Sequence, residues 1–135
     1  MYFVTLCLRD RLPLLSDKKV SEATWNYLKS LFEPKGNWII GAVFLHDHVH
    51  LIIELKKDSN LTLGKTVMDL KLGLWRAMRR AGIKEEKIWQ KNYFEHVIRN
   101  NDDLVEKLRY MRGNPVKAGL VEKVEDWQYY WDRFL

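Results

Sequence analysis

Two histidines stand two residues apart in a run of alternating residue types. Side chains at i and i+2 of a strand share a face, so His48 and His50 project together. The other face of this strand carries the apolar residues Val49, Leu51, Ile53 and Leu55. Two imidazoles on one strand face lie close enough to chelate one cation, which makes the pair a candidate metal site. The alternative interpretation is a pair of ordinary, solvated surface histidines.

A tyrosine stands off the apolar stripe of an expected helix near the C-terminus. That stripe is formed by Leu104, Leu108 and Met111. At about 100° per residue, Tyr110 lies roughly 120° away from the stripe. Asn114, four residues later, falls on the same helical face as Tyr110, so a phenol oxygen and an amide oxygen can point at one ligand. The alternative is an exposed aromatic residue followed by an asparagine that ends the helix before Pro115.

The chain has two further histidines, His46 and His96, which are considered as additions to this candidate metal site. His46 has the same parity as His48 and His50, which allows a three-histidine zinc site. His46 and Asp47 are expected to form a turn, however, where the strand rule fails, so we expect His46 to be solvated. His96 stands alone in a later strand, and we expect it to be structural; the alternative is that a neighbouring strand brings His96 or Glu95 beside the pair.

A small set of elements must position these residues. Aromatic, β-branched and alternating residues predict strands over residues 2–8, 38–45, 48–55 and part of 89–98. Helical spacing predicts a helix capped by Ser21, a second over residues 61–82 and a third capped within residues 100–102. The segment Pro34-Lys35-Gly36 is expected to end the first helix, and Pro115 to limit the third.

This order of elements predicts an α+β fold. The two-residue connection between strands 38–45 and 48–55 requires them to be antiparallel. A four-stranded antiparallel sheet with helices packed on one face, close to the ferredoxin-like unit, is the economical architecture. The aromatic tail over residues 118–135 is expected to pack back on the domain.

Length and composition restrict the class of protein. With 135 residues, 47% hydrophobic and 30% charged, the chain fits one domain over residues 1–135. Its apolar runs are far shorter than the roughly 20 residues that span a bilayer, and residues 2–8 lack the flanks of a signal peptide, so we expect a cytoplasmic protein. The single cysteine, Cys7, is expected to be a buried thiol in a reducing compartment.

A modest positive charge is concentrated in one segment. The net charge is +5, and the basic residues gather between residues 65 and 91 with few acidic ones. This pattern is compatible with a polyanionic partner, and Trp75 is an aromatic residue on which a base could stack. The alternative is a solvated helix face. The candidate DNA-binding residues are Lys65, Lys71, Arg76, Arg79 and Arg80, with Lys107 one turn before Tyr110.

Three segments together resemble a known family. They are FLHDHVHLII over residues 44–53, WQKNYFEHVIRN over residues 89–100 and YMRGNPVKAGLV over residues 110–121. Together they resemble the single-tyrosine HUH transposase domain, in the branch of REP-associated tyrosine transposases, over nearly the whole chain. Two positions depart from the family pattern. His46-Asp47 replaces the usual proline-led pair, and Gly113 stands where an aliphatic or polar residue is commoner.

The resemblance implies an RRM-like or ferredoxin-like fold and an enzyme that cuts and rejoins single-stranded DNA beside a hairpin or repeat. It implies Tyr110 as the nucleophile that forms a 5′-phosphotyrosine, carried on the C-terminal helix. It also implies His48, His50 and Asn114 as ligands of Mg²⁺ or Mn²⁺. No nucleotide cofactor is expected, and both a monomer and a homodimer are compatible with the resemblance. The alternatives are a non-catalytic single-stranded nucleic-acid-binding module and a zinc hydrolase.

Overall fold

A computed structural model describes residues 1–32, 38–57 and 59–135 of the chain. The strands are β1 (Tyr2–Cys7), β2 (Ile39–Phe44), β3 (His48–Ile53), β4 (Phe94–Val97) and β5 (Tyr130–Asp132). The helices are α1 (Lys18–Lys29), α2 (Leu63–Arg80) and α3 (Asn101–Lys117). The expected end of the first helix at residues 34–36 lies outside the described residues. No helix in the described ranges is long and apolar enough to cross a bilayer.

The strands form one antiparallel sheet in the order β4-β1-β3-β2-β5. The predicted α+β class is confirmed, but the sheet has five strands instead of four. The additional strand, β5, comes from the aromatic tail and pairs with the free edge of β2, where Val43 lies opposite Tyr130. With only three residues, β5 is too short to show the alternation by which a strand is predicted.

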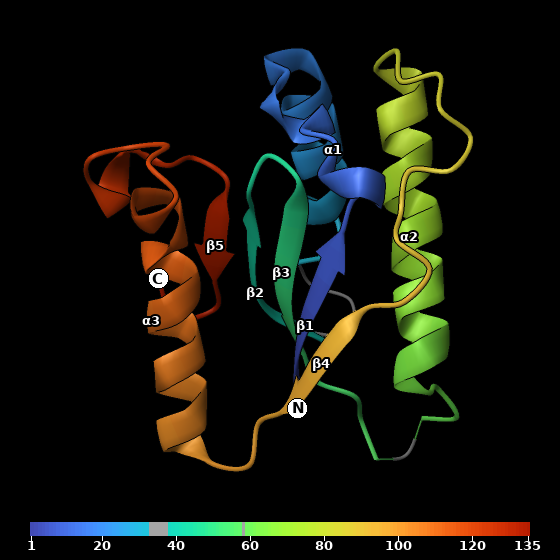
Figure 1. Cartoon of the computed structure of the whole chain (residues 1–135). Helices are drawn as coiled ribbons and strands as arrows, with labels where there is room; N and C mark the ends of the chain where they lie inside the picture. The colour runs from blue at the N-terminus through green and yellow to red at the C-terminus, as the bar shows by residue number, and fades with distance from the viewer. Residues whose placement is uncertain (33–37, 58) are drawn as a thin grey trace.

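Helices cover both faces of the sheet (Figure 1). Val49, Leu51 and Ile53 of β3 face α1 and α2, as their spacing predicts, and are fully buried there. The opposite face carries Ile52, which packs with Met111 of α3 in a second, smaller core. The expectation that the histidine face is the more accessible one is wrong for His50, which is only 4% exposed. The reason is that α3 lies over that face.

The helix ends differ from expectation at two places. Asp17, not Ser21, caps α1 by accepting a hydrogen bond from the Val20 amide at 3.1 Å. The predicted cap of α3 is confirmed, since the Asn100 side chain accepts from the Asp103 amide at 2.9 Å. Pro115 does not limit α3, which continues to Lys117. A proline removes only one backbone donor and is tolerated close to the end of a helix whose next amides still find carbonyls.

Two glycines inside helices are expected to respond oppositely to alanine. A Cβ on Gly73 of α2 would lie 1.8 Å from the Tyr27 hydroxyl of α1, whereas a Cβ on Gly113 of α3 meets no atom within 4 Å. Gly113→Ala should therefore stabilise the fold by roughly 0.5–1 kcal/mol through helix propensity. Gly73→Ala should destabilise it by about 1–3 kcal/mol, because the Tyr27 ring must move.

Urea denaturation of both variants measures this difference. If Gly73→Ala stabilised the protein as much as Gly113→Ala, the close packing of α1 against α2 at Tyr27 would be contradicted.

Candidate active site

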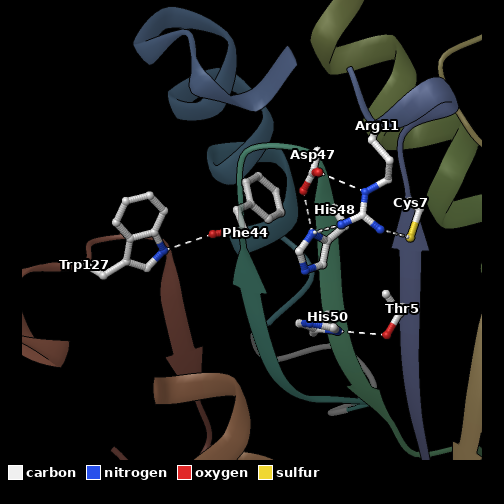
Figure 2. Close-up of polar contacts among 8 residues, drawn as sticks. All are labelled: Thr5, Cys7, Arg11, Phe44, Asp47, His48, His50 and Trp127. Atoms are coloured by element: carbon white, nitrogen blue, oxygen red, sulfur yellow. Dashed lines mark hydrogen bonds and ion pairs between the residues drawn. The ribbon is translucent and has the colours of Figure 1, made fainter. Parts of the chain in front are cut away.

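The two histidines of β3 are held by their Nδ1 atoms. The His50 Nδ1 lies 2.8 Å from the Thr5 hydroxyl oxygen, on the neighbouring strand β1. The His48 Nδ1 lies 2.7 Å from Oδ1 of Asp47 and donates its proton to that carboxylate. The two rings are 4.7 Å apart between centroids, at 80° (Figure 2). Fixing each ring through Nδ1 leaves both Nε2 atoms as the potential ligand atoms.

His50 is a neutral, buried imidazole. The pKa of His50 is lowered to about 3, chiefly by burial and also by the charges of His48 and Arg11, while hydrogen bonding to Asn114 acts in the opposite direction. Its Nε2 is fully buried and, among the described residues, no hydrogen bond of normal geometry reaches it. The neutral imidazole is the form of histidine that binds metal ions.

The carboxylate that holds His48 also holds an arginine. Arg11 Nε donates to Oδ2 of Asp47 at 2.9 Å, on the oxygen that His48 does not use (Figure 2). Burial raises the pKa of Asp47, but hydrogen bonds from His48 and Arg11 outweigh it and hold that pKa below its usual value. Asp47 is therefore an ionised bridge between the two side chains.

The third helix brings a phenol and an amide to the same place. The Tyr110 ring lies 5.6 Å from the His50 ring and 6.0 Å from the Phe3 ring, edge-on to both. Tyr110 is 45% exposed, so its hydroxyl is accessible to a ligand, whereas Asn114 one turn later is 9% exposed. Phe3 in turn stacks on His50, with centroids 5.1 Å apart.

These side chains line one cavity of about 450 Å³. The predicted residues Tyr110, His48, His50 and Asn114 all lie on its wall, so the structure brings together what the sequence analysis grouped from two distant segments. Their chemical roles remain predictions. The other lining residues are Thr5, Cys7, Arg11, Phe94, Lys117 and Ala118.

The other histidines do not join this group. The His46 ring packs near Trp127, 6.1 Å between centroids, and His46 is half-buried where we expected it to be solvated. Within the described ranges, no three side chains of the His, Cys, Asp or Glu type gather to hold a metal ion, so the three-histidine zinc site does not form. His96 is exposed, lies opposite Phe3 and does not line the cavity. Cys7 is a free, buried thiol, as expected.

Most of the predicted DNA-binding residues lie elsewhere. Lys65, Lys71, Arg76, Arg79 and Arg80 belong to α2, on the face of the sheet opposite the cavity (Figure 1). Lys71 donates to the Gln90 carbonyl at 3.0 Å and Arg79 donates to the Lys84 carbonyl at 2.9 Å. The half-buried Trp75 donates to the Glu85 carbonyl. Their role in DNA binding remains a prediction, but the structure does not bring this set to the histidines.

Two cationic side chains that line the cavity, Arg11 and Lys117, were not among the residues that the sequence predicted. Lys107, which was predicted, lies over the Phe3 ring at 5.5 Å and is near the cavity without lining it. Lys117 shares the face of Tyr110 and Asn114 and would have been found had the helix been continued past Pro115. Arg11 lies in a segment that reads as a break between elements, and no spacing links it to the histidines.

Comparisons with known proteins relate this chain to a family of transposases. Residues 1–113 match the family described as "Transposase IS200 like". The chain is 32% identical to the putative REP-associated tyrosine transposase of Haemophilus influenzae, over 96% of this chain and 77% of that protein. It is also 32% identical to the REP-associated tyrosine transposase of Escherichia coli, over 64% of this chain and 49% of that protein.

The fold is similar as well. A solved structure of a REP-associated tyrosine transposase bound to a REP hairpin superposes with a TM-score of 0.69 at 29% identity, covering 96% of this chain and 74% of that one. The family match covers most of the chain and includes β1, β3 and the part of α3 that carries Tyr110. The chain therefore belongs to the IS200-like transposase family, whose membership implies an enzyme that cleaves and rejoins DNA.

Proposed function

We propose that this chain is a metal-dependent single-stranded DNA endonuclease and strand transferase that forms a 5′-phosphotyrosine intermediate through Tyr110. One observation carries the proposal. The accessible phenol of Tyr110 shares a cavity with two imidazoles held by their Nδ1 atoms and with the amide of Asn114. A cavity of about 450 Å³ has room for a phosphate beside these groups.

The reaction balances without a further reactant. The Tyr110 oxygen forms a bond to phosphorus, the bond from phosphorus to the 3′ oxygen breaks, and the leaving strand takes up a proton as its 3′ hydroxyl. The phenol proton passes to water, since Tyr110 is open to solvent. The phosphotyrosine keeps a phosphoester bond, so a later 3′ hydroxyl can attack it and rejoin the strands.

The side chains present fit a divalent cation. His48 and His50 would hold it through Nε2 and Asn114 through its amide oxygen, and the buried, unpartnered Nε2 of His50 is the observation that favours this use. Two nitrogens and one oxygen with open positions suit Mn²⁺ or Mg²⁺. When bound, such an ion neutralises and polarises the attacked phosphate.

The substrate that we propose is single-stranded DNA next to a hairpin. The solved relative is described as bound to a REP hairpin. On this chain, Arg11 and Lys117 supply positive charge at the cavity. Phe94 of β4 is 67% exposed at the cavity and offers a face on which an unpaired base can stack.

The alternative of a binding module without catalysis is less well supported by the fold. An RRM-like module stacks bases on exposed aromatic residues of its central strands. Here α3 covers that face, and Ile52 at its centre is fully buried against Met111. Among the described residues, β4 at the edge of this sheet is exposed.

A covalent-adduct assay tests the proposal. The chain is incubated with hairpin oligonucleotides that carry single-stranded flanks, labelled at either end, with Mn²⁺, with Mg²⁺ or with a chelator. We expect a denaturation-resistant adduct that holds only the fragment 3′ to the cut, a free 3′ hydroxyl on the other fragment, and no adduct with the chelator. Fully duplex DNA of the same sequence serves as the control. Binding without an adduct in either metal would reject catalysis and leave the binding module.

A further inference from the structure

The guanidinium of Arg11 at the cavity is oriented by the carboxylate of Asp47, which also orients the His48 ring. Arg11 belongs to the short 3-10 turn η1 (Arg9–Arg11) that follows β1. Its Nε is held by Asp47, one guanidinium nitrogen lies 3.5 Å from Nδ1 of His48, and the other lies 3.5 Å from the sulfur of Cys7 (Figure 2). The side chain is 53% exposed and lines the cavity together with Tyr110.

Most of the donors of this guanidinium are available to a ligand. Arg11 has five N–H donors, of which one goes to the carboxylate of Asp47 at 2.9 Å. The Nδ1 of His48 already donates to Asp47, so it is not an acceptor for Arg11. The thiol of Cys7, at 3.5 Å, is a weak acceptor. The planar fork therefore retains strong donors beside the histidines, which suits a phosphate.

The backbone that carries Arg11 is strained. Asp10 and Arg11 both have φ of 55°, in the left-handed region that residues other than glycine seldom adopt. Hydrogen bonds hold the turn there, from the Arg9 amide to the Ile88 carbonyl at 2.7 Å and from the Arg11 amide to the Leu8 carbonyl at 3.0 Å. Two consecutive residues in this region next to a cavity are typical of functional positions.

We infer that Arg11 contacts the substrate directly, binding a non-bridging oxygen of the phosphate that lies between Tyr110 and the histidines. Asp47 orients both the guanidinium and the His48 ring, so one carboxylate sets the position of two groups around that phosphate. This inference rests on the proposed function for the identity of the ligand, single-stranded DNA. It adds a residue that lies outside the three sequence segments that resemble the family.

Binding to DNA with single neutral linkages tests the contact. Affinities are measured in the Tyr110→Phe background with a chelator present, for hairpin oligonucleotides in which one phosphate at a time is a methylphosphonate. Adding Arg11→Ala should weaken binding of unmodified DNA by about tenfold, as expected for a charge-assisted hydrogen bond. When the methylphosphonate replaces the phosphate that Arg11 contacts, Arg11→Ala should weaken binding no further. This dependence of the Arg11→Ala effect on one linkage is called coupling below.

Matched variants distinguish a contact with one phosphate from a general electrostatic contribution of positive charge to DNA binding. Arg9→Ala removes the same charge two residues away, from a side chain that is 55% exposed and does not line the cavity, and should show no coupling to any linkage. Arg11→Lys keeps the charge but not the fork and should recover only part of the affinity. Because Arg11→Ala leaves Oδ2 of Asp47 without its arginine partner, Arg11→Ala/Asp47→Asn is measured as well, and its coupling should be the same.

The outcomes are distinguishable. An Arg11→Ala effect that is equal at every linkage, or absent, overturns the contact, and a purely structural role would appear as a lowered melting temperature without coupling. If coupling is found at one linkage but the wild-type chain forms no adduct, the proposed catalysis fails while the phosphate contact stands. If the adduct forms at a linkage where Arg11 shows no coupling, the inference fails and the proposed function stands.

Discussion

Tyr110→Phe is expected to abolish the covalent protein–DNA adduct, with a loss of at least about 10⁴-fold in the cleavage rate, because removal of a nucleophile leaves no equivalent group. The ring contacts with Phe3 and His50 are made by carbon atoms that phenylalanine keeps, so the fold and the affinity for DNA should change little. The adduct is measured on denaturing gels with labelled hairpin oligonucleotides, and the affinity by anisotropy.

Another tyrosine of this chain provides the matched control. Tyr93 is half-exposed, lies beside Phe94 in the sequence and is absent from the wall of the cavity. Tyr93→Phe should cleave DNA at the wild-type rate. An adduct that persists in Tyr110→Phe and disappears in Tyr93→Phe would assign the nucleophile to the wrong residue.

Loss of either histidine of β3 should remove metal-dependent cleavage. We expect His48→Ala and His50→Ala to lower the cleavage rate by at least about 100-fold, since each removes one ligand of the proposed ion. Because the rings are fixed through Nδ1 by Asp47 and Thr5, the loss should also appear as weaker binding of Mn²⁺ alone, measured by titration calorimetry or by paramagnetic resonance.

The remaining histidine on this face gives the control for the metal experiment. His96 of β4 is exposed and lies opposite Phe3, outside the cavity. His96→Ala should bind Mn²⁺ and cleave DNA as the wild type does. His50 is buried, so a melting curve accompanies each variant, and the more exposed His48 carries the test if His50→Ala unfolds. Unchanged Mn²⁺ binding in a folded His48→Ala would contradict the proposed ligand set.

Local periodicity was sufficient to predict which face of the strand carries His50 and which face of the helix carries Tyr110. The alternation around His50 assigns it to the face opposite Leu51, and the helical spacing around Tyr110 separates it from Met111. Both assignments depend only on the geometry of a single strand or helix, and the structure confirms both. That these two faces meet was inferred from the family resemblance, because spacing within one element carries no information about a distant one.

What the sequence did not predict depends on packing between distant segments. Nothing near His50 indicates that α3 covers it, yet this contact decides its burial and its pKa. Arg11 reaches Asp47 across 36 positions of sequence from a turn that is recognisable only by its φ angles. The basic residues of α2 were prominent in the composition, but a helix surface is charged whether or not it meets a ligand.

The position of β5 has a consequence for the order in which the protein is made. β5 completes the sheet against β2, which precedes it by some 86 positions, and the Trp127 indole donates to the Phe44 carbonyl at 3.0 Å beside this pairing. On the ribosome, the edge of β2 stays without a partner until residue 132 has been added. The second core, against which Tyr130 packs, lacks this partly buried residue until then. In a nascent chain, the residues that line the cavity are therefore made before all the residues that pack α3 onto the sheet are present.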